Sequence, residues 1–298
     1  MKRLARGLRI GWILIPFLWA FLRDRRRFIL LGSPARRSEA QHQARAERLT
    51  RRIAGLGPTF IKLAQIFSSR ADLLPEPYLT SIGTLQDQVP PFPAPEARAV
   101  LEAELGKPVS ELFESFEDEP LAAASLGQVH RARYRGEDVV VKILRPGVEE
   151  TVALDLDLSF RLLFWLNVLF PNHHVQGITN VVREFSVRVR EEMDFRSEAR
   201  NMDRFRKSFR DAEGVAVPRV HDAVSGRRVL VMEYMRGTKV DRLHERFESG
   251  ELRFQEVMDR LTGLYLRMML MDGFLHADLH PGNLLVDARG RIVILDWG

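Results

Sequence analysis

The pattern of apolar and polar positions divides the chain into stretches of different periodicity. Helical spacing dominates the first 110 residues and returns over 149–170 and 178–210. A proline-rich stretch at 89–95 interrupts the first region and predicts an extended connector. Apolar or alternating runs elsewhere predict short strands. Helices are also expected at 34–57, 59–69, 95–105 and 254–271, and strands at 121–134, 138–144, 215–220, 228–233, 284–286 and 292–295.

This order of elements predicts an α+β protein. Several strands and one long helix come first, a connector follows, and a helix, a polar loop and a hairpin come last. Such an order favours two lobes with a cleft between them. We expect four segments, which cover residues 1–33, 34–110, 111–235 and 236–298.

The most apolar stretch lies near the N-terminus, where residues 10–22 read IGWILIPFLWAFL. It is shorter than the roughly 20 residues that span a bilayer, and no small-x-small cleavage site follows it. Trp12 and Trp19 suit a membrane interface. The segment is therefore either a short interfacial anchor on an anionic leaflet or an amphipathic helix docked on its own protein. The basic residues around it are Lys2, Arg3, Arg6, Arg9, Arg23, Arg25, Arg26 and Arg27.

Composition narrows the class of protein. The 298 residues contain 45% hydrophobic residues and carry a formal net charge of +5, which is globular composition and excludes a mostly disordered or polytopic membrane chain. Cysteine is absent, which excludes disulfides, thiolate metal sites and a cysteine nucleophile, and fits a reducing compartment. No basic stripe with interleaved aromatic residues is present, so we expect no nucleic-acid partner.

The strongest chemical signal lies at the C-terminal end, where FLHADLHPGN is followed by ILDWG. Asp278 stands five residues before Asn283 and eighteen before Asp296. Asp and Asn supply the hard oxygen ligands that Mg²⁺ prefers, and a short hairpin would bring them to one end of a sheet. The spacing matches the H-x-D-x-x-x-x-N and D-x-G motifs of protein kinases and predicts phosphoryl transfer from a nucleotide.

Upstream, the strand VVVKI matches the V-A-I-K strand of kinases, and its Lys142 is one of only six lysines. We expect Lys142 to reach the nucleotide phosphates and to need a carboxylate partner on a helix. The residues alone leave four acids open for that role: Glu191, Glu192, Asp194 and Glu198.

One part of an ordinary kinase is missing. No glycine-rich loop precedes the lysine strand; LAAASLGQ stands there instead. Glycines let backbone N–H groups approach phosphates closely, and alanine methyl groups reduce that freedom. Phosphate contact there is expected to differ from that of an ordinary kinase. The residues concerned are Ala122, Ala123, Ala124 and Ser125.

With these motifs in order, the chain resembles the UbiB family of atypical kinase-like proteins, also called aarF-domain or ABC-one-like kinases, over about residues 55–298. The alanine-rich loop, HADLHPGN and LDWG are joined by Lys62-Leu63-Ala64-Gln65 and by Glu192-Met193-Asp194. The resemblance implies a protein-kinase-like two-lobed fold with an N-terminal helical extension. The N-lobe would cover 111–235 and a partial C-lobe 236–298.

The resemblance also implies roles for individual residues. Lys142 contacts the phosphates and pairs with Glu198, Asp278 is the catalytic-loop aspartate, and Asn283 and Asp296 bind Mg²⁺.

Further roles follow from the same resemblance. Lys62 and Gln65 come from an extension that folds over the cleft, with Lys62 near Glu192. The alanine-rich loop contacts the nucleotide, and the hinge under the adenine covers Glu233 and Met235.

By the same resemblance the protein is an ATP- and Mg²⁺-dependent kinase or ATPase. It supports ubiquinone or other isoprenoid-quinone biosynthesis and is peripheral on the cytoplasmic face of a membrane. Expected partners are nucleotide, isoprenoid lipid and quinone-biosynthesis proteins. The alternative is a non-catalytic, nucleotide-binding membrane scaffold. An ordinary protein kinase is disfavoured by the alanine-rich loop and by the extension, which occupies the place of a peptide substrate.

Two departures from the family pattern stand out. Ala64 replaces a glycine, and the chain ends at Gly298 inside the D-x-G motif. The C-lobe is therefore expected to be truncated and to expose apolar surface.

Overall fold

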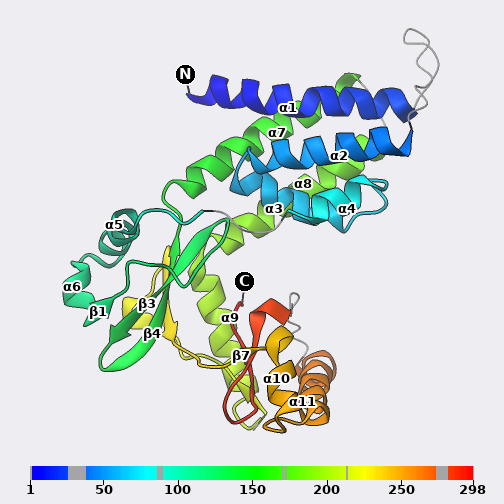
Figure 1. The fold of residues 1–298 in the computed structure, drawn as a ribbon. Helices are drawn as coiled ribbons and strands as arrows, with labels where there is room; N and C mark the ends of the chain where they lie inside the picture. The colour runs from blue at the N-terminus through cyan, green and yellow to red at the C-terminus, as the bar shows by residue number, and fades with distance from the viewer. Residues whose placement is uncertain are drawn as a thin grey trace. The chain divides into compact units, whose positions relative to one another are not determined.

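The computed structural model describes residues 2–25, 38–85, 90–169, 171, 173–212, 214–272 and 281–297 (Figure 1). The chain forms two compact units. The helical unit comprises Met1–Pro91, Ala123–Leu126 and Gly147–Arg190, and the mixed unit comprises Phe92–Ala122, Gly127–Pro146 and Glu191–Gly298. The fold class is confirmed as α+β.

The helical unit is built from long amphipathic helices. Ser38 caps α2: its side chain accepts from the backbone N–H of Gln41, and the Gln41 side chain accepts from the backbone N–H of Ser38. Apolar residues of α3 and α4 are buried between the helices. The helices are α1 (Lys2–Arg25), α2 (Glu39–Ala54), α3 (Pro58–Ser68), α4 (Tyr78–Gly83), α7 (Val148–Leu169) and α8 (His173–Glu192), whose last two residues belong to the mixed unit.

The mixed unit contains two sheets. The first has strand order β1-β3-β4-β6, with β2 beside β3, and its ladders through β3 and β4 are antiparallel. The second has order β5-β9-β8-β7. The strands are β1 (Ser115–Phe116), β2 (Ala122–Ala123), β3 (Gly127–Tyr134), β4 (Glu137–Leu144), β5 (Val215–Ala216), β6 (Val229–Glu233), β7 (Thr238–Lys239), β8 (Leu284–Val286) and β9 (Ile292–Ile294).

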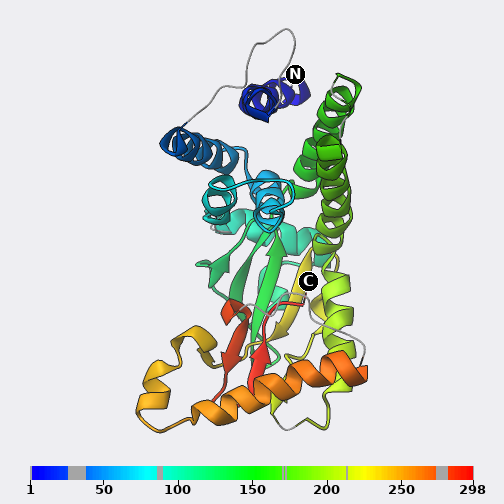
Figure 2. The same cartoon turned by 90° about the vertical axis from the view of Figure 1, so that its right-hand side faces the viewer.

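Helices complete the mixed unit. Residues of α5, β3, β4 and β6 share one buried apolar core. Figure 2 shows α11 lying across the end of the hairpin formed by β8 and β9. The helices are α5 (Ala94–Leu105), α6 (Val109–Leu112), α9 (Phe195–Ser208), α10 (His244–Glu248) and α11 (Phe254–Arg267), and a π-helical turn continues α11 over Met268–Asp272.

Three predicted elements need correction. The single helix expected over 178–210 is wrong, because α8 ends at Glu192 and Asp194 caps α9: its carboxylate accepts a hydrogen bond from the Arg196 backbone N–H. The strand expected over 215–220 stops after Ala216, and Pro218 beyond it has no N–H to donate. The strand expected over 121–134 is interrupted between β2 and β3.

The apolar N-terminal segment forms one helix, α1, that contains Pro16. No helix in the described part of the chain is long and apolar enough to cross a bilayer.

A buried polar network links the start of the mixed unit to its sheet. The Phe92 N–H donates to Gln128 Oε1 (3.0 Å), and Gln128 Nε2 donates to the Phe92 carbonyl (3.2 Å). The same amide nitrogen lies 2.8 Å from His130 Nε2, so that imidazole nitrogen must accept. His130 Nδ1 then donates to the Glu117 carbonyl (2.8 Å). The network therefore needs neutral His130.

The His130 network predicts a pH dependence of stability. Burial lowers the pKa of His130 below its ordinary 6.5. The unfolded chain therefore takes up a proton before the folded chain does, and stability falls as the pH drops below 6.5 toward the folded pKa. The His130→Gln variant lacks this proton. Urea titrations from pH 7.5 to 5 measure how the free energy of unfolding changes with pH. This free energy should fall more steeply for the parent than for the variant, by up to about 1.4 kcal/mol per pH unit. Equal slopes would contradict the assigned tautomer.

Candidate nucleotide-binding site

Side chains of β4 alternate between the two faces of the first sheet, and this alternation orients Lys142. Val139, Val141 and Ile143 are fully buried in the core that the sheet shares with α5. Because successive side chains of a strand point to opposite faces, Lys142 points away from that core. The Lys142 side chain has a relative solvent exposure of 23%. A lone lysine in a valine-rich strand is thus presented on the other face of the sheet.

The break between α8 and α9 orients Glu198. Asp194 is the N-cap of α9, and Glu198 lies in the first turn of that helix. The partial positive charge of a helix N-terminus favours a carboxylate there. Glu198 is buried, with 4% of its surface exposed, so its carboxylate needs a partner inside the protein.

Lys142 lies between two carboxylates. Its Nζ donates to both oxygens of Glu198 (2.9 and 2.8 Å) and to Asp296 Oδ1 (3.2 Å). The Phe195 ring centroid is 5.3 Å from the same nitrogen, within the range of a cation–π contact. One cation therefore joins the first sheet, α9 and the chain just after β9.

Burial and charge act in opposite senses on these groups. Burial alone would lower the pKa of Lys142, but the charges of Asp296 and Glu198 raise it above its ordinary value. Burial raises the pKa of Glu198, and the nearby charge of Asp296 adds to that rise against the opposing effect of Lys142. Two acids thus compete for one cation, and Asp296 is the more exposed of them, at 48%.

The hairpin of β8 and β9 brings Asn283 and Asp296 to one end of the second sheet. Leu284 pairs with Ile294, and the Leu295 N–H donates to the Asn283 carbonyl (2.9 Å). Asp296 follows directly, and its Oδ1 also accepts from the Trp297 N–H (3.0 Å). The two residues expected to bind Mg²⁺ therefore flank the open end of a single hairpin.

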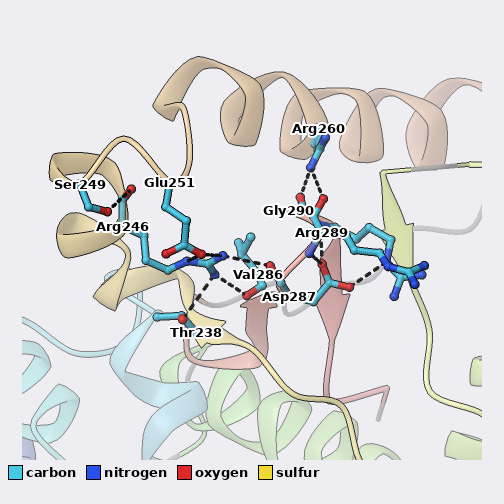
Figure 3. Close-up of polar contacts among 10 residues, drawn as sticks. Thr238, Arg246, Ser249, Glu251, Arg260, Val286, Asp287, Arg289 and Gly290 are labelled. Atoms are coloured by element: carbon cyan, nitrogen blue, oxygen red, sulfur yellow. Dashed lines mark hydrogen bonds and ion pairs between the residues drawn. The ribbon is translucent and has the colours of Figure 1, made fainter.

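The opposite end of this hairpin is held by two arginines from helices (Figure 3). Arg246 of α10 donates to the Val286 and Asp287 carbonyls (3.1 and 3.3 Å). Arg260 of α11 donates to the Gly290 carbonyl. The Asp287 carboxylate accepts from the Arg289 N–H inside the turn (2.8 Å). These bonds fix the turn and with it the direction in which the hairpin presents its open end.

Trp297 anchors the chain after Asp296, and sequence reasoning missed its partners. Its indole N–H donates to the Ile294 carbonyl (3.1 Å), and its own carbonyl accepts from Asn201 of α9 (3.0 Å). Its ring packs edge-on against Phe205, with centroids 4.5 Å apart. Apolar periodicity marks Phe205 as a core residue, but nothing local links it to Trp297. The same is true of Phe195 and Lys142.

The expected hinge lies where the first sheet gives way to the second. Glu233 ends β6, and the following Tyr234 N–H donates to the Asp138 carbonyl (3.1 Å). Met235 packs against the apolar cluster of the second sheet. Gly237 lies close behind, where a Cβ would meet the Val286 carbonyl oxygen at 2.9 Å. The role of Glu233 and Met235 beside an adenine stays a prediction.

Other expected site residues lie elsewhere in the chain. Asp278 is outside the described residues. Lys62 and Gln65 lie on α3 in the helical unit, where Gln65 donates to the Leu85 carbonyl (3.3 Å). Ala64 beside them is buried. Glu192 is the last residue of α8 and belongs to the mixed unit, so its expected approach to Lys62 stays a prediction.

The alanine-rich loop begins in one unit and continues in the other. Ala122 and Ala123 form β2, while Ala124 and Ser125 follow it. At Gly127, where β3 begins, a Cβ would lie 2.5 Å from the Ile143 carbonyl oxygen, so glycine is required there by close packing of two strands. The contact of this loop with a nucleotide stays a prediction.

The donor set at the hairpin fits Mg²⁺ held together with a nucleotide. Asp296 offers a partly exposed carboxylate, and Asn283 offers amide oxygen chemistry beside it. No group of three His, Cys, Asp or Glu side chains in the described part of the chain is arranged as a metal site. Mg²⁺ commonly takes one or two protein ligands and completes its shell with phosphate oxygens and water, which is the chemistry that this pair provides for.

Comparison with known proteins decides the family. A model of the ABC1 atypical kinase-like domain matches residues 84–298. The chain belongs to the ABC1 atypical kinase-like family. The resemblance noted from the sequence motifs is thereby confirmed, and so is the kinase-like fold class.

Two relatives and one solved structure illustrate the match. Probable protein kinase UbiB from Marinobacter nauticus is 34% identical over 100% of this chain and 56% of its own length. Protein ACTIVITY OF BC1 COMPLEX KINASE 8, chloroplastic, from Arabidopsis thaliana is 36% identical over 98% of this chain and 39% of its own. The complex of Rv3197 with erythromycin from Mycobacterium tuberculosis has a TM-score of 0.58 and 32% identity, covering 87% of this chain and 65% of that one.

The matched region is only part of these proteins. The chain spans about half the length of the curated relatives it matches, at 47% and 50% for two from Synechocystis.

The ion pair between Lys142 and Glu198 predicts a coupled effect on stability. Lys142→Met leaves two acids near each other without their cation, and we expect a loss of about 1–3 kcal/mol, below the full cost for a completely buried pair. Adding Glu198→Gln should recover most of this loss, because no buried charge then lacks a partner. Denaturant unfolding of the parent, both single variants and the double variant measures the coupling.

The matched control is Lys207→Met, which removes an exposed lysine paired with Asp203 in the i,i+4 relation. This change should cost less than about 0.5 kcal/mol. Strictly additive effects of Lys142→Met and Glu198→Gln would show that the pair contributes nothing to the fold.

Proposed function

We propose that the chain is the nucleotide-binding part of an atypical kinase or ATPase that acts in isoprenoid-quinone metabolism. The phosphoryl group would pass from ATP to water or to a small or lipid acceptor. The observation that supports this most is the position of Lys142 between Glu198 and Asp296, with Asn283 across the same hairpin. The family match supports kinase-like chemistry, and the relative named UbiB supports the link to quinones.

In this proposal Lys142 and Glu198 form the fixed part of the site. Glu198 keeps Lys142 charged and directed away from the core, and Lys142 donates to the phosphates of bound ATP. Asp296 exchanges its bond to Lys142 for its role in holding Mg²⁺, with Asn283 beside it. Bound Mg²⁺ supplies neutralisation of the phosphate charge.

The acceptor would be positioned by the catalytic-loop aspartate. Asp278 accepts the proton of the attacking hydroxyl or orients the attacking water, as the corresponding aspartate of kinases does. Lys62 and Gln65 would act from the extension, with Lys62 near Glu192, and the extension would restrict access to the nucleotide. A restricted site favours water or a small acceptor over a protein side chain.

The Asp278→Asn variant tests whether the site performs chemistry. We expect the parent to hydrolyse ATP slowly and only with Mg²⁺. The variant should lose at least 100-fold in rate, because general-base assistance contributes about 10²–10⁴. It should still show the rise in unfolding temperature that MgATP gives the parent. Phosphate release and thermal unfolding measure the two properties side by side.

Equal hydrolysis by the parent and Asp278→Asn would reject the catalytic role. MgATP binding without any hydrolysis in the parent would instead favour a nucleotide-controlled scaffold. Thermal unfolding that does not respond to MgATP would contradict the nucleotide site as a whole.

A further inference from the structure

Helix α1 exposes one continuous apolar stripe to solvent. Its members recur at intervals of four, four, three and four residues, so they lie on a single helix face. Their exposed fractions are high for such large side chains, and Trp12 reaches 74%. The stripe consists of Leu4, Leu8, Trp12, Ile15 and Trp19.

The opposite face of α1 is docked on its own unit. Arg6 forms a two-point ion pair with Asp155 of α7 (both contacts 2.7 Å) and also donates to the Leu56 carbonyl (2.6 Å). Ile10 is buried at 2% exposure, and the Phe17 ring packs edge-on against Tyr78, with centroids 5.4 Å apart. One face of α1 is therefore docked on the protein, as the second hypothesis for this segment expects. The other face presents the apolar side chains that an interfacial anchor needs.

The ion pair fixes which face of α1 points outward. Asp155 is fully buried, so rolling the helix to hide its apolar stripe would leave that carboxylate without its arginine inside the protein. Breaking a buried pair is strongly unfavourable. The apolar stripe is therefore held in solvent by a specific interaction and is not a loosely placed tail.

The end of α7, in the same helical unit, exposes a second group of apolar side chains. Phe164, Trp165, Val168 and Leu169 are all more than half exposed. Figures 1 and 2 both show this end of α7 reaching the level of α1 in the helical unit. The chain has four tryptophans; three of them are exposed on these two helices, and Trp297 alone is buried. Tryptophan suits the boundary between lipid and water, where the ring is buried and the N–H stays hydrated.

Charge identifies the partner. Helix α1 contains six basic residues and one acidic residue, and the basic residues lie at both of its ends. Packing against α1 of a second copy would bring basic ends together in either direction, which like-charge repulsion opposes. An anionic bilayer surface matches the charge and accepts the apolar stripe.

We propose that the exposed faces of α1 and of the end of α7 form one surface that lies in the interface of an anionic membrane. Helix α1 lies flat, with Trp12 and Trp19 at the depth of the headgroups and its basic ends near lipid phosphates. The Arg6–Asp155 pair transmits this orientation to the helical unit. The surface is separate from the nucleotide site and needs no nucleotide.

Vesicle binding of the whole chain, without nucleotide, tests this surface. We expect co-sedimentation with vesicles of phosphatidylglycerol and phosphatidylcholine, a blue shift of tryptophan emission, and weaker binding to pure phosphatidylcholine or at 0.5 M salt (about a 4 Å screening length). The double variant Leu8→Gln/Trp12→Gln should lose at least tenfold in partitioning. Its circular dichroism should match the parent, because both side chains are exposed.

The control is Phe254→Gln, which changes an aromatic residue of the mixed unit that is 60% exposed. This variant should bind vesicles as the parent does. The proposal is overturned by absence of binding to anionic vesicles, by unchanged binding of the double variant, or by self-association on concentration that the double variant abolishes. Since no nucleotide is present, failure here leaves the proposed function untouched, and failure of the ATP experiments leaves this surface untouched.

Discussion

The mixed unit depends on one lysine that two carboxylates share. Lys142 is attached to the first sheet, Glu198 to α9 and Asp296 to the hairpin of the second sheet, so a single cation connects the three parts that a nucleotide would have to contact. Of the two acids around this lysine, Asp296 is the more exposed, and in the proposed function it is the one that leaves the lysine to hold Mg²⁺. Glu198, buried in the first turn of α9, stays with the lysine.

Short-range rules predicted much of this architecture. The apolar run over 138–144 predicted the strand that is β4, with Lys142 as its lone charged residue in the run VVVKI, and turn residues predicted the hairpin between Asn283 and Asp296. The helix break at Asp194 was missed, because apolar spacing continues across it and hides the cap. The choice of Glu198 among four acids came from the family resemblance. Spacing alone could not make it, since the choice depends on which turn of α9 faces the sheet.

The supporting contacts of the site lie beyond sequence reasoning for a different reason. Asn201 and Phe205 hold Trp297 across almost a hundred positions of chain, and Arg246 and Arg260 fix the turn of the hairpin from two separate helices. Such contacts are set by tertiary packing. The helical unit shows the same principle: the apolar period of α1 is plain in the sequence, but tertiary contacts such as the ion pair between Arg6 and Asp155 decide which of its faces is outside.

In the proposed function Lys142 exchanges its bond to Asp296 for bonds to the nucleotide phosphates. Calorimetric titration with ATP tests this exchange most directly. The account predicts that Lys142→Met loses ATP affinity both with Mg²⁺ and with a chelator, since the phosphate contact itself is removed. Asp296→Asn should lose only the part of the affinity that Mg²⁺ adds. Binding of MgATP to Lys142→Met with the affinity of the parent would contradict the account.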